Sequence, residues 1–285
     1  MLRRPIESLR RKVLDHLVLR PSRHEIPIAT QQRVMLDAST GKIECLVHRS
    51  TAKPDSSPTS KNLVVLKFPG TAGRAERSSR FPADMLTAVS SQPVVADVWT
   101  WNPPGYGRSE GRATLASVMT ASIDFWQQVT RQYPDPATRV WLCGNSLGCV
   151  TALHVAATIQ PDTNRTGVIL RNPPPLIPVV KRIAHRYPLG RLIDPVAETL
   201  DPRMNATVTA GQVNLPAVFL QSELDSLVPP RMQQNIVDAY AGQKRVVTLG
   251  GLEHDCLHDE THESEIRDAL LWLWNTSEVT GRVRS

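Results

Sequence analysis

The sequence predicts an α/β protein with a mainly parallel central sheet flanked by helices. From residue 62 onward, short apolar runs alternate with longer stretches of helical periodicity, which is the pattern of βα units. Hydrophobic residues make up 41% of the chain and charged residues 21%, as in ordinary globular proteins. No run approaches the roughly 18 apolar residues that a membrane-spanning helix needs. We therefore expect a folded, soluble protein with one sizeable core.

The first 24 residues predict an amphipathic helix outside the main domain, which we place at residues 25–285. The helix is expected to begin near Pro5. Two extended stretches follow, at 26–37 and 43–48, with a hairpin turn at 38–42 between them. The apolar residues that share one face of the helix, through spacings of three and four, are Ile6, Leu9, Val13, Leu14, Leu17 and Val18.

The alternating region supplies the rest of the sheet. Residues 172–214 interrupt the alternation, contain a run of three prolines and are too long for an ordinary connection, so we interpret them as a short cap insertion. The expected buried strands are 62–68, 94–101, 139–143, 167–170, 217–221 and 245–249, and the expected helices lie near 75–90, 114–132, 147–159, 230–241 and 263–275.

The net charge of +6 is concentrated at the N-terminus. Residues 1–24 carry seven Lys and Arg against two acidic residues, a net charge of +5. The remainder is nearly neutral, so we expect no nucleic-acid partner. Two interpretations of the basic helix stay open: its apolar face packs on the main domain, which we favour, or the helix contacts anionic membrane peripherally.

The spacing of the cysteines and the composition of the N-terminal segment indicate the cellular compartment. The four cysteines form no CxxC pair, and no second pair of ligands accompanies Cys256 and His258 at a zinc-type spacing. The N-terminus lacks the continuous apolar core of a secretory signal peptide. We expect reduced thiols, no bound metal and a cytoplasmic location. Peripheral attachment to a membrane surface is the alternative location.

A strand–turn–helix motif provides the first candidate for chemistry. Gly144-Asn145-Ser146-Leu147-Gly148 lies between the strand at 139–143 and the helix at 147–159. In such a turn the glycines avoid collisions with the backbone, and the serine is held in a strained conformation with its hydroxyl exposed. We favour Ser146 as a nucleophile over the alternative, an ordinary glycine-rich turn.

A serine hydroxyl needs a base, and the base needs a group that orients it. Asp225 follows the strand at 217–221, and His254 follows the strand at 245–249, so both lie at the carboxyl ends of parallel strands. The rivals are Glu223 for the acid and His258 and His262 for the base, and we expect the two histidines on a solvated face.

Together these motifs resemble those of the α/β-hydrolase superfamily, in the order Ser, Asp, His. Phe68-Pro69-Gly70-Thr71-Ala72-Gly73 resembles the family's oxyanion loop, and the segment from Trp101 to Gly111 resembles its Gly-x-Gly-x-Ser loop. The resemblance covers roughly residues 25 to 275 and implies the α/β-hydrolase fold. It also implies an oxyanion hole formed by the backbone N–H groups of Leu147 and Thr71. Many members have His-Gly where this chain has Pro69-Gly70.

The resemblance implies a serine hydrolase that works through an acyl-enzyme and needs no cofactor or metal. An esterase or thioesterase acting on a small-molecule acyl substrate is the preferred activity, with the substrate-binding residues unassigned. Three alternatives stay open: an acyltransferase, a peptidase, and a catalytically silent binding protein on the same fold.

Overall fold

The computed structural model describes residues 3–50, 62–91 and 94–277. In this part of the chain eight strands form one sheet, in the order β1-β2-β4-β3-β5-β6-β7-β8. The predicted fold class is confirmed. The strands are β1 (Gln32–Ala38), β2 (Gly41–His48), β3 (Leu63–Phe68), β4 (Ala96–Trp101), β5 (Arg139–Asn145), β6 (Thr166–Arg171), β7 (Ala217–Ser222) and β8 (Lys244–Leu249).

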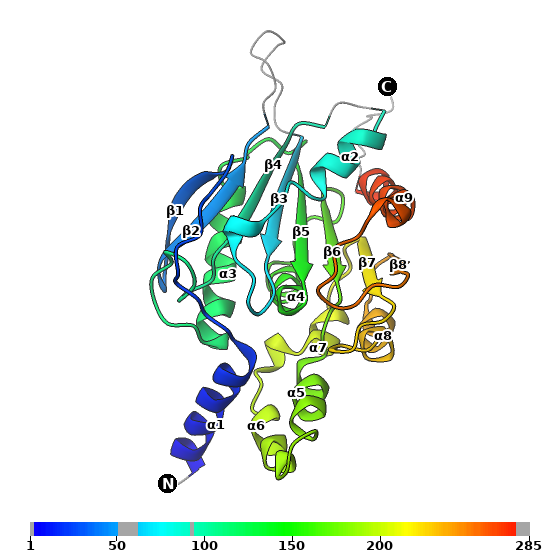
Figure 1. Ribbon diagram of the computed structural model, residues 1–285. Coiled ribbons are helices and arrows are strands. Elements are labelled where there is room, and N and C mark those ends of the chain that lie inside the picture. Colours follow the sequence, from blue (N-terminus) through cyan, green and yellow to red (C-terminus); the bar gives the residue numbers. More distant parts are fainter. Residues whose placement is uncertain (1–2, 51–61, 92–93, 278–285) are drawn as a thin grey trace.

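The sheet is parallel from β4 to β8, and only the pairs β1–β2 and β2–β4 are antiparallel. Parallel pairing directs the carboxyl ends of β3, β5, β6, β7 and β8 to one edge of the sheet, which is the lower edge in Figure 1. This edge is therefore where loops from distant parts of the sequence meet.

Helices cover both faces of the sheet (Figure 1). One face packs against α3, α4 and α8, and the other against α2 and α9. The helices of the described residues are α1 (Arg3–Val18), α2 (Ala83–Val89), α3 (Leu115–Thr130), α4 (Leu147–Ile159), α5 (Leu176–Ala184), α6 (Asp194–Ala197), α7 (Ala206–Ala210), α8 (Pro230–Ala239) and α9 (Glu260–Thr276), with short 3-10 turns at Ala75–Arg77, Gly190–Ile193 and Pro202–Met204.

Burial on both faces explains why the strands read as continuous apolar runs. In β3, Val64 and Leu66 belong to the core under α3 and α4, while Leu63 and Val65 belong to the core under α2 and α9. Successive side chains of a strand point to opposite faces, so a strand covered on both sides needs apolar residues at every position.

Two predicted elements differ from the structure. The strand expected at 26–37 begins only at Gln32, which pairs with Val47 near the end of β2. No strand of the described residues pairs with residues 26–31. The helix expected near 75–90 is a short 3-10 turn followed by α2, because Pro82 lacks an N–H and disfavours helical geometry at the preceding residue.

The region predicted as a cap forms α5, α6 and α7 between β6 and β7, and α5 and α6 extend beyond the carboxyl edge of the sheet (Figure 1). α1 packs beside α6 and extends from the same edge. Leu14 and Val18 of α1 join the main core, whereas Ile6 and Leu9 are 50% and 62% exposed. No helix in the described residues is long and apolar enough to cross a membrane.

Candidate active site

Ser146 occupies a strained turn between β5 and α4. Its backbone has φ 51° and ψ −121°, in the left-handed half of conformational space that non-glycine residues rarely adopt. A Cβ atom at Gly148 would lie 1.8 Å from the carbonyl oxygen of Phe68, and one at Gly144 would lie 2.6 Å from the Cα of Cys149. Only glycine fits at these two positions, which explains the Gly-x-Ser-x-Gly spacing.

The structure brings Ser146, His254 and Asp225 into one hydrogen-bonded array. The Nε2 atom of His254 lies 2.9 Å from the Ser146 hydroxyl oxygen, and its Nδ1 atom lies 2.6 Å from Oδ2 of Asp225. Asp225 is buried, His254 is nearly so, and Ser146 is partly exposed. The array can move a proton from the serine hydroxyl to the imidazole while the carboxylate holds the ring.

Asp225 is held by hydrogen bonds from its own loop. The backbone N–H groups of Leu227 and Val228 donate to its Oδ1 over 3.0 and 2.7 Å, and the side chain of Gln233 donates to Oδ2 over 3.1 Å. Because Oδ1 is taken by the loop, Oδ2 is directed at His254. Because Asp225 lies in the turn before α8, its Oδ1 faces the N–H groups of that turn and its Oδ2 faces His254.

The rivals for these roles lie elsewhere. The carboxylate of Glu223 is exposed and accepts from the N–H of Gly251. His262 forms a capping box with Asp259 at the start of α9, and its side chain is only 10% exposed, so the expectation that it lies on a solvated face is wrong. His258 is partly buried, with its ring 5.6 Å from that of Phe81, so the expectation that it lies on a solvated face is wrong. Among the candidates, only His254 contacts Ser146, and only Asp225 contacts His254.

The two backbone donors predicted for an oxyanion hole flank the serine. Neither the N–H of Leu147 nor that of Thr71 donates a hydrogen bond to another described residue. The carbonyl oxygen of Gly70 accepts from the N–H of Gly73, which sets the plane of the peptide between Gly70 and Thr71. A Cβ built at Gly70 would lie 3.3 Å from the Cβ of Ser146, so this peptide lies directly beside the serine.

Asn172 is a site residue that the sequence does not reveal, because its place before three prolines indicates only the start of the cap. Its side-chain amide donates to the hydroxyl of Ser222 and to the backbone carbonyl of His254, and its Oδ1 accepts from the N–H of Ser222. The residue is fully buried and has φ 51°. It therefore ties the end of β6 to the end of β7 and to the histidine loop.

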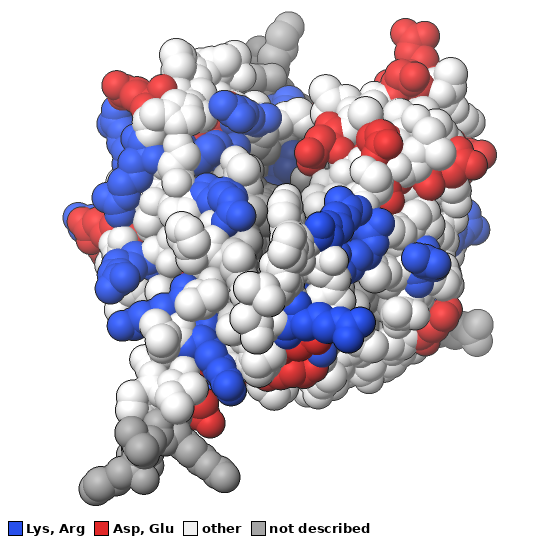
Figure 2. Space-filling model, turned by 60° about the horizontal axis from the view of Figure 1, so that its bottom comes forward, with Lys and Arg blue, Asp and Glu red and all other residues white. Residues whose placement is uncertain are grey.

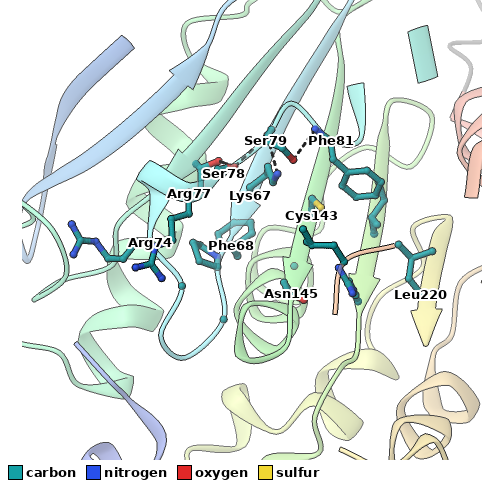
Figure 3. Close-up of a pocket in the computed structure, with 18 of the residues that line it drawn as sticks. Lys67, Phe68, Arg74, Arg77, Ser78, Ser79, Phe81, Cys143, Asn145 and Leu220 are labelled. Carbon is teal, nitrogen blue, oxygen red and sulfur yellow. Dashed lines mark hydrogen bonds between the residues drawn. The ribbon is translucent and has the colours of Figure 1, made fainter. Parts of the chain in front are cut away.

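A cavity of about 280 Å³ adjoins the serine on the side of the sheet covered by α2 and α9. Gly70 and Gly144 line it together with Asn145, the residue before the serine. Figure 3 shows side chains from β3, β5 and β7 and from the segment 74–81 around this space. Ser146 itself does not line the cavity, but its chain neighbour Asn145 and the adjacent Gly70 do, so the cavity begins next to the serine.

Comparisons with known proteins agree with this architecture at low sequence identity. No protein-family model matches the chain, and no curated protein matches it. Among solved structures, the esterase Pf2001 of Pyrococcus furiosus is 13% identical with a TM-score of 0.64, over 90% of this chain and 98% of that one.

Two further structures are similar. Est1E from Butyrivibrio proteoclasticus, solved with ferulic acid, is 15% identical with a TM-score of 0.61, over 85% of this chain and 99% of that one. An α/β serine hydrolase without a lid from Xanthomonas campestris is 16% identical with a TM-score of 0.53, over 88% and 97%. With the observed strand order, these likenesses show that the chain has the α/β-hydrolase fold.

Proposed function

We propose that this protein is a serine hydrolase that cleaves small acyl esters or thioesters through an acyl-enzyme. The observation that carries the proposal is the pair of hydrogen bonds, 2.9 and 2.6 Å long, that joins Ser146 to His254 and His254 to Asp225. The similar structures described as esterases and serine hydrolases support a carboxylic ester as the preferred substrate class.

In the proposed reaction His254 accepts the Ser146 proton as the oxygen attacks the acyl carbon. The N–H groups of Leu147 and Thr71 stabilise the oxyanion, and His254 then delivers the proton to the leaving group. Water, activated by the same histidine, hydrolyses the acyl-enzyme and regenerates the serine. Asp225 keeps the histidine in the tautomer that presents an unprotonated Nε2 to the serine.

A fluorophosphonate probe tests the proposal, because it labels a serine only when a base activates the hydroxyl. We expect labelling of the wild type and none of Ser146→Ala. Removing His254 or converting Asp225 to Asn should lower ester turnover by about four orders of magnitude. His262→Ala is the matched control, since its ring caps α9 away from the serine. Unlabelled wild type would instead favour the silent binding protein.

A panel of 4-nitrophenyl esters and acyl thioesters of graded chain length then separates esterase from thioesterase. Adding an alcohol acceptor to the same assay separates hydrolysis from acyl transfer, because an acyltransferase gives a new ester in place of the acid. A set of short peptides tests the peptidase alternative in the same way.

We also propose that α1 contacts anionic membrane. Ile6 and Leu9 remain exposed on the half of the helix farther from the core, and Arg10, Arg11 and Lys12 follow them in the sequence. Each basic residue near an anionic surface contributes on the order of 1 kcal/mol at low salt. Co-sedimentation with phosphatidylserine vesicles should be lost in Ile6→Ser/Leu9→Ser, and equal binding by both proteins would rule out the contact.

A further inference from the structure

The cavity beside Ser146 is lined by cations and by no carboxylate. Lys67 comes from the end of β3, Arg171 from the end of β6, and Arg74 and Arg77 from the segment between β3 and α2, while His258 closes the side nearest α9. Figure 3 shows Lys67 projecting toward Ser79 within the same space as Phe81 and Cys143. Among the described residues, no Asp or Glu side chain lines the cavity.

One of these cations is already neutralised. Arg74 is buried, forms an ion pair with Glu76 and donates to the carbonyl oxygens of Ser22 and His24. Its role is to hold the N-terminal segment against the loop that follows β3. The charge available to a ligand therefore comes from the other cations.

The remaining cations have no acidic partner among the described residues. The ammonium group of Lys67 donates to the carbonyl oxygen of Ser79 over 3.0 Å, and Arg77 is exposed with no ion pair. Arg171 donates one Nη to the carbonyl oxygen of Cys256, but its Nε is buried without a hydrogen-bond partner. A buried N–H without an acceptor is costly and is a position where a ligand oxygen would be stabilised.

For both Lys67 and Arg171, burial outweighs the nearby groups that favour the charged form. Burial lowers the pKa of Lys67 below its ordinary 10.5 and lowers the pKa of Arg171 as well. Asp84 near Lys67 and Asp255 near Arg171 act in the opposite direction, but neither lines the cavity and neither offsets the burial. An anion in the cavity would stabilise both charged forms.

The other walls are apolar and limit the size of the ligand. Four apolar side chains line the cavity. Phe81 and Leu257 lie on the side of α2 and α9, and Ile169 and Leu220 belong to β6 and β7. A volume of about 280 Å³ is at the small end of ligand pockets. The space suits a short hydrocarbon chain that ends in a compact charged group.

The surface around the cavity also carries cationic side chains. Figure 2 looks toward the edge of the sheet at which the strands end, and it shows Lys and Arg side chains beside a hollow, with Asp and Glu side chains on the same face. A surface of this kind raises the local concentration of anionic substrates.

We propose that this cavity binds a carboxylate at the far end of a short acyl chain, so that the enzyme prefers half-esters of dicarboxylic acids. The inference rests on the proposed hydrolase function and names its substrate class. The ester carbonyl lies at Ser146, and the carboxylate at the other end of the chain pairs with Lys67 and Arg171 and receives the free Nε–H of Arg171.

Kinetics with two matched substrates test the preference. The 4-nitrophenyl monoester of glutaric acid is negatively charged, and its methyl ester has the same chain without the charge. In wild type we expect kcat/KM to be at least tenfold higher for the charged substrate. The ratio should fall by about tenfold or more in Lys67→Met and in Arg171→Met, and by a smaller factor in Arg77→Gln. Lys42→Met, which removes an exposed strand lysine outside the cavity, should leave the ratio unchanged.

Binding without turnover separates this inference from the hydrolase proposal. Isothermal titration calorimetry of Ser146→Ala with glutarate, at constant ionic strength, should show saturable binding that glutaramide does not reproduce and that Lys67→Met weakens at least tenfold. If the esters are cleaved but the charged and neutral substrates react alike, the carboxylate site is wrong and the hydrolase stands. If neither ester is cleaved but glutarate binds, the anion site stands and the hydrolase is wrong.

Folding defects are controlled by thermal melting of each variant, with Lys42→Met as the matched substitution of an exposed lysine outside the cavity. A wild-type protein that binds no glutarate and shows no preference between the two esters overturns the inference regardless of the variants.

Discussion

The hydroxyl of Tyr106 donates a 2.8 Å hydrogen bond to the carbonyl oxygen of Thr71 and accepts one of 3.0 Å from the backbone N–H of Arg20. Tyr106 is almost fully buried in the loop after β4, and burial raises its pKa to about 12, so the hydroxyl remains a donor at neutral pH. The hydroxyl of Tyr106 thus links three segments: the segment after α1, the loop after β4 and the loop beside the serine.

Replacing this tyrosine should loosen the loop that carries one of the two proposed oxyanion donors. We expect Tyr106→Phe to lower kcat about tenfold with a smaller change in KM, because the Thr71 N–H matters most when charge develops on the substrate. The cost to folding should be about 1 kcal/mol. Steady-state kinetics and thermal melting measure the two effects.

Tyr133→Phe is the matched control, since that hydroxyl bonds Asp97 and Trp99 away from the serine. It should reduce stability and leave kcat unchanged. An equal fall of kcat in both variants would mean that Tyr106 acts only through stability.

Asn172 should matter to both folding and turnover. In Asn172→Ala the buried N–H of Ser222 loses its acceptor, which costs about 1–3 kcal/mol, and alanine at φ 51° adds about 1 kcal/mol of strain. Asn172→Gly removes the same hydrogen bonds but relieves the strain. We therefore expect the alanine variant to melt at the lower temperature and both variants to lose kcat, because the carbonyl of His254 is released.

Gln160→Gly provides the comparison at another left-handed position, the exposed end of α4. It should not lower kcat. If the two Asn172 variants kept wild-type kcat while losing stability, the residue would be structural only.

The cap helix α5 presents two kinds of apolar residue. Leu176 is buried in the main core and Val179 is buried as well, whereas Ile177 and Val180 are only partly buried where they pack against that core. Arg182 of the same helix donates to the carbonyl of Ser226 beside the acid. We expect Ile177→Ala/Val180→Ala to change acyl chain-length preference with a small effect on melting. Leu176→Ala should instead destabilise by about 2–5 kcal/mol.

The ester panel and thermal melting together check this division. An unaltered chain-length profile in the Ile177/Val180 variant, accompanied by a large fall in melting temperature, would show that the whole face only packs the cap onto the core.

His154 predicts a pH dependence of stability. The residue is buried in α4, and burial, with a smaller effect of Arg203, lowers its pKa below the ordinary 6.5. The folded state then binds the proton less readily than the unfolded state, so stability present at pH 7 is lost as the pH falls below about 6.5. His154→Gln should flatten the melting temperature between pH 7 and 5.

The control for this measurement is His16→Gln, at an exposed position on α1. It should retain the wild-type slope. Identical slopes in wild type and His154→Gln would show that another group controls stability in this range.

The fold and the order of the candidate residues could be predicted from the sequence because both depend on local sequence patterns. Apolar runs covered on both sides mark the parallel strands, and the two glycines around Ser146 mark a turn in which a Cβ would collide with Phe68 or Cys149. The strands at 62–68 and 245–249 were placed to within a residue for the same reason.

Long-range contacts decided the rest. Three histidines lie between residues 254 and 262, and only the path of the loop after β8 decides that His254 reaches Ser146 while His258 enters the cavity and His262 caps α9. Three features of the site depend on residues that lie 35 to 104 positions apart in the sequence. They are the hydrogen bond from Asn172 to His254, the hydrogen bond from Tyr106 to Thr71, and the shared cavity of Lys67 and Arg171. The sequence by itself therefore determined which elements form and where the reactive residue types stand, because spacing controls local structure. Which side chains face each other across the end of the sheet was decided only by the tertiary structure, because that depends on how separate strands align.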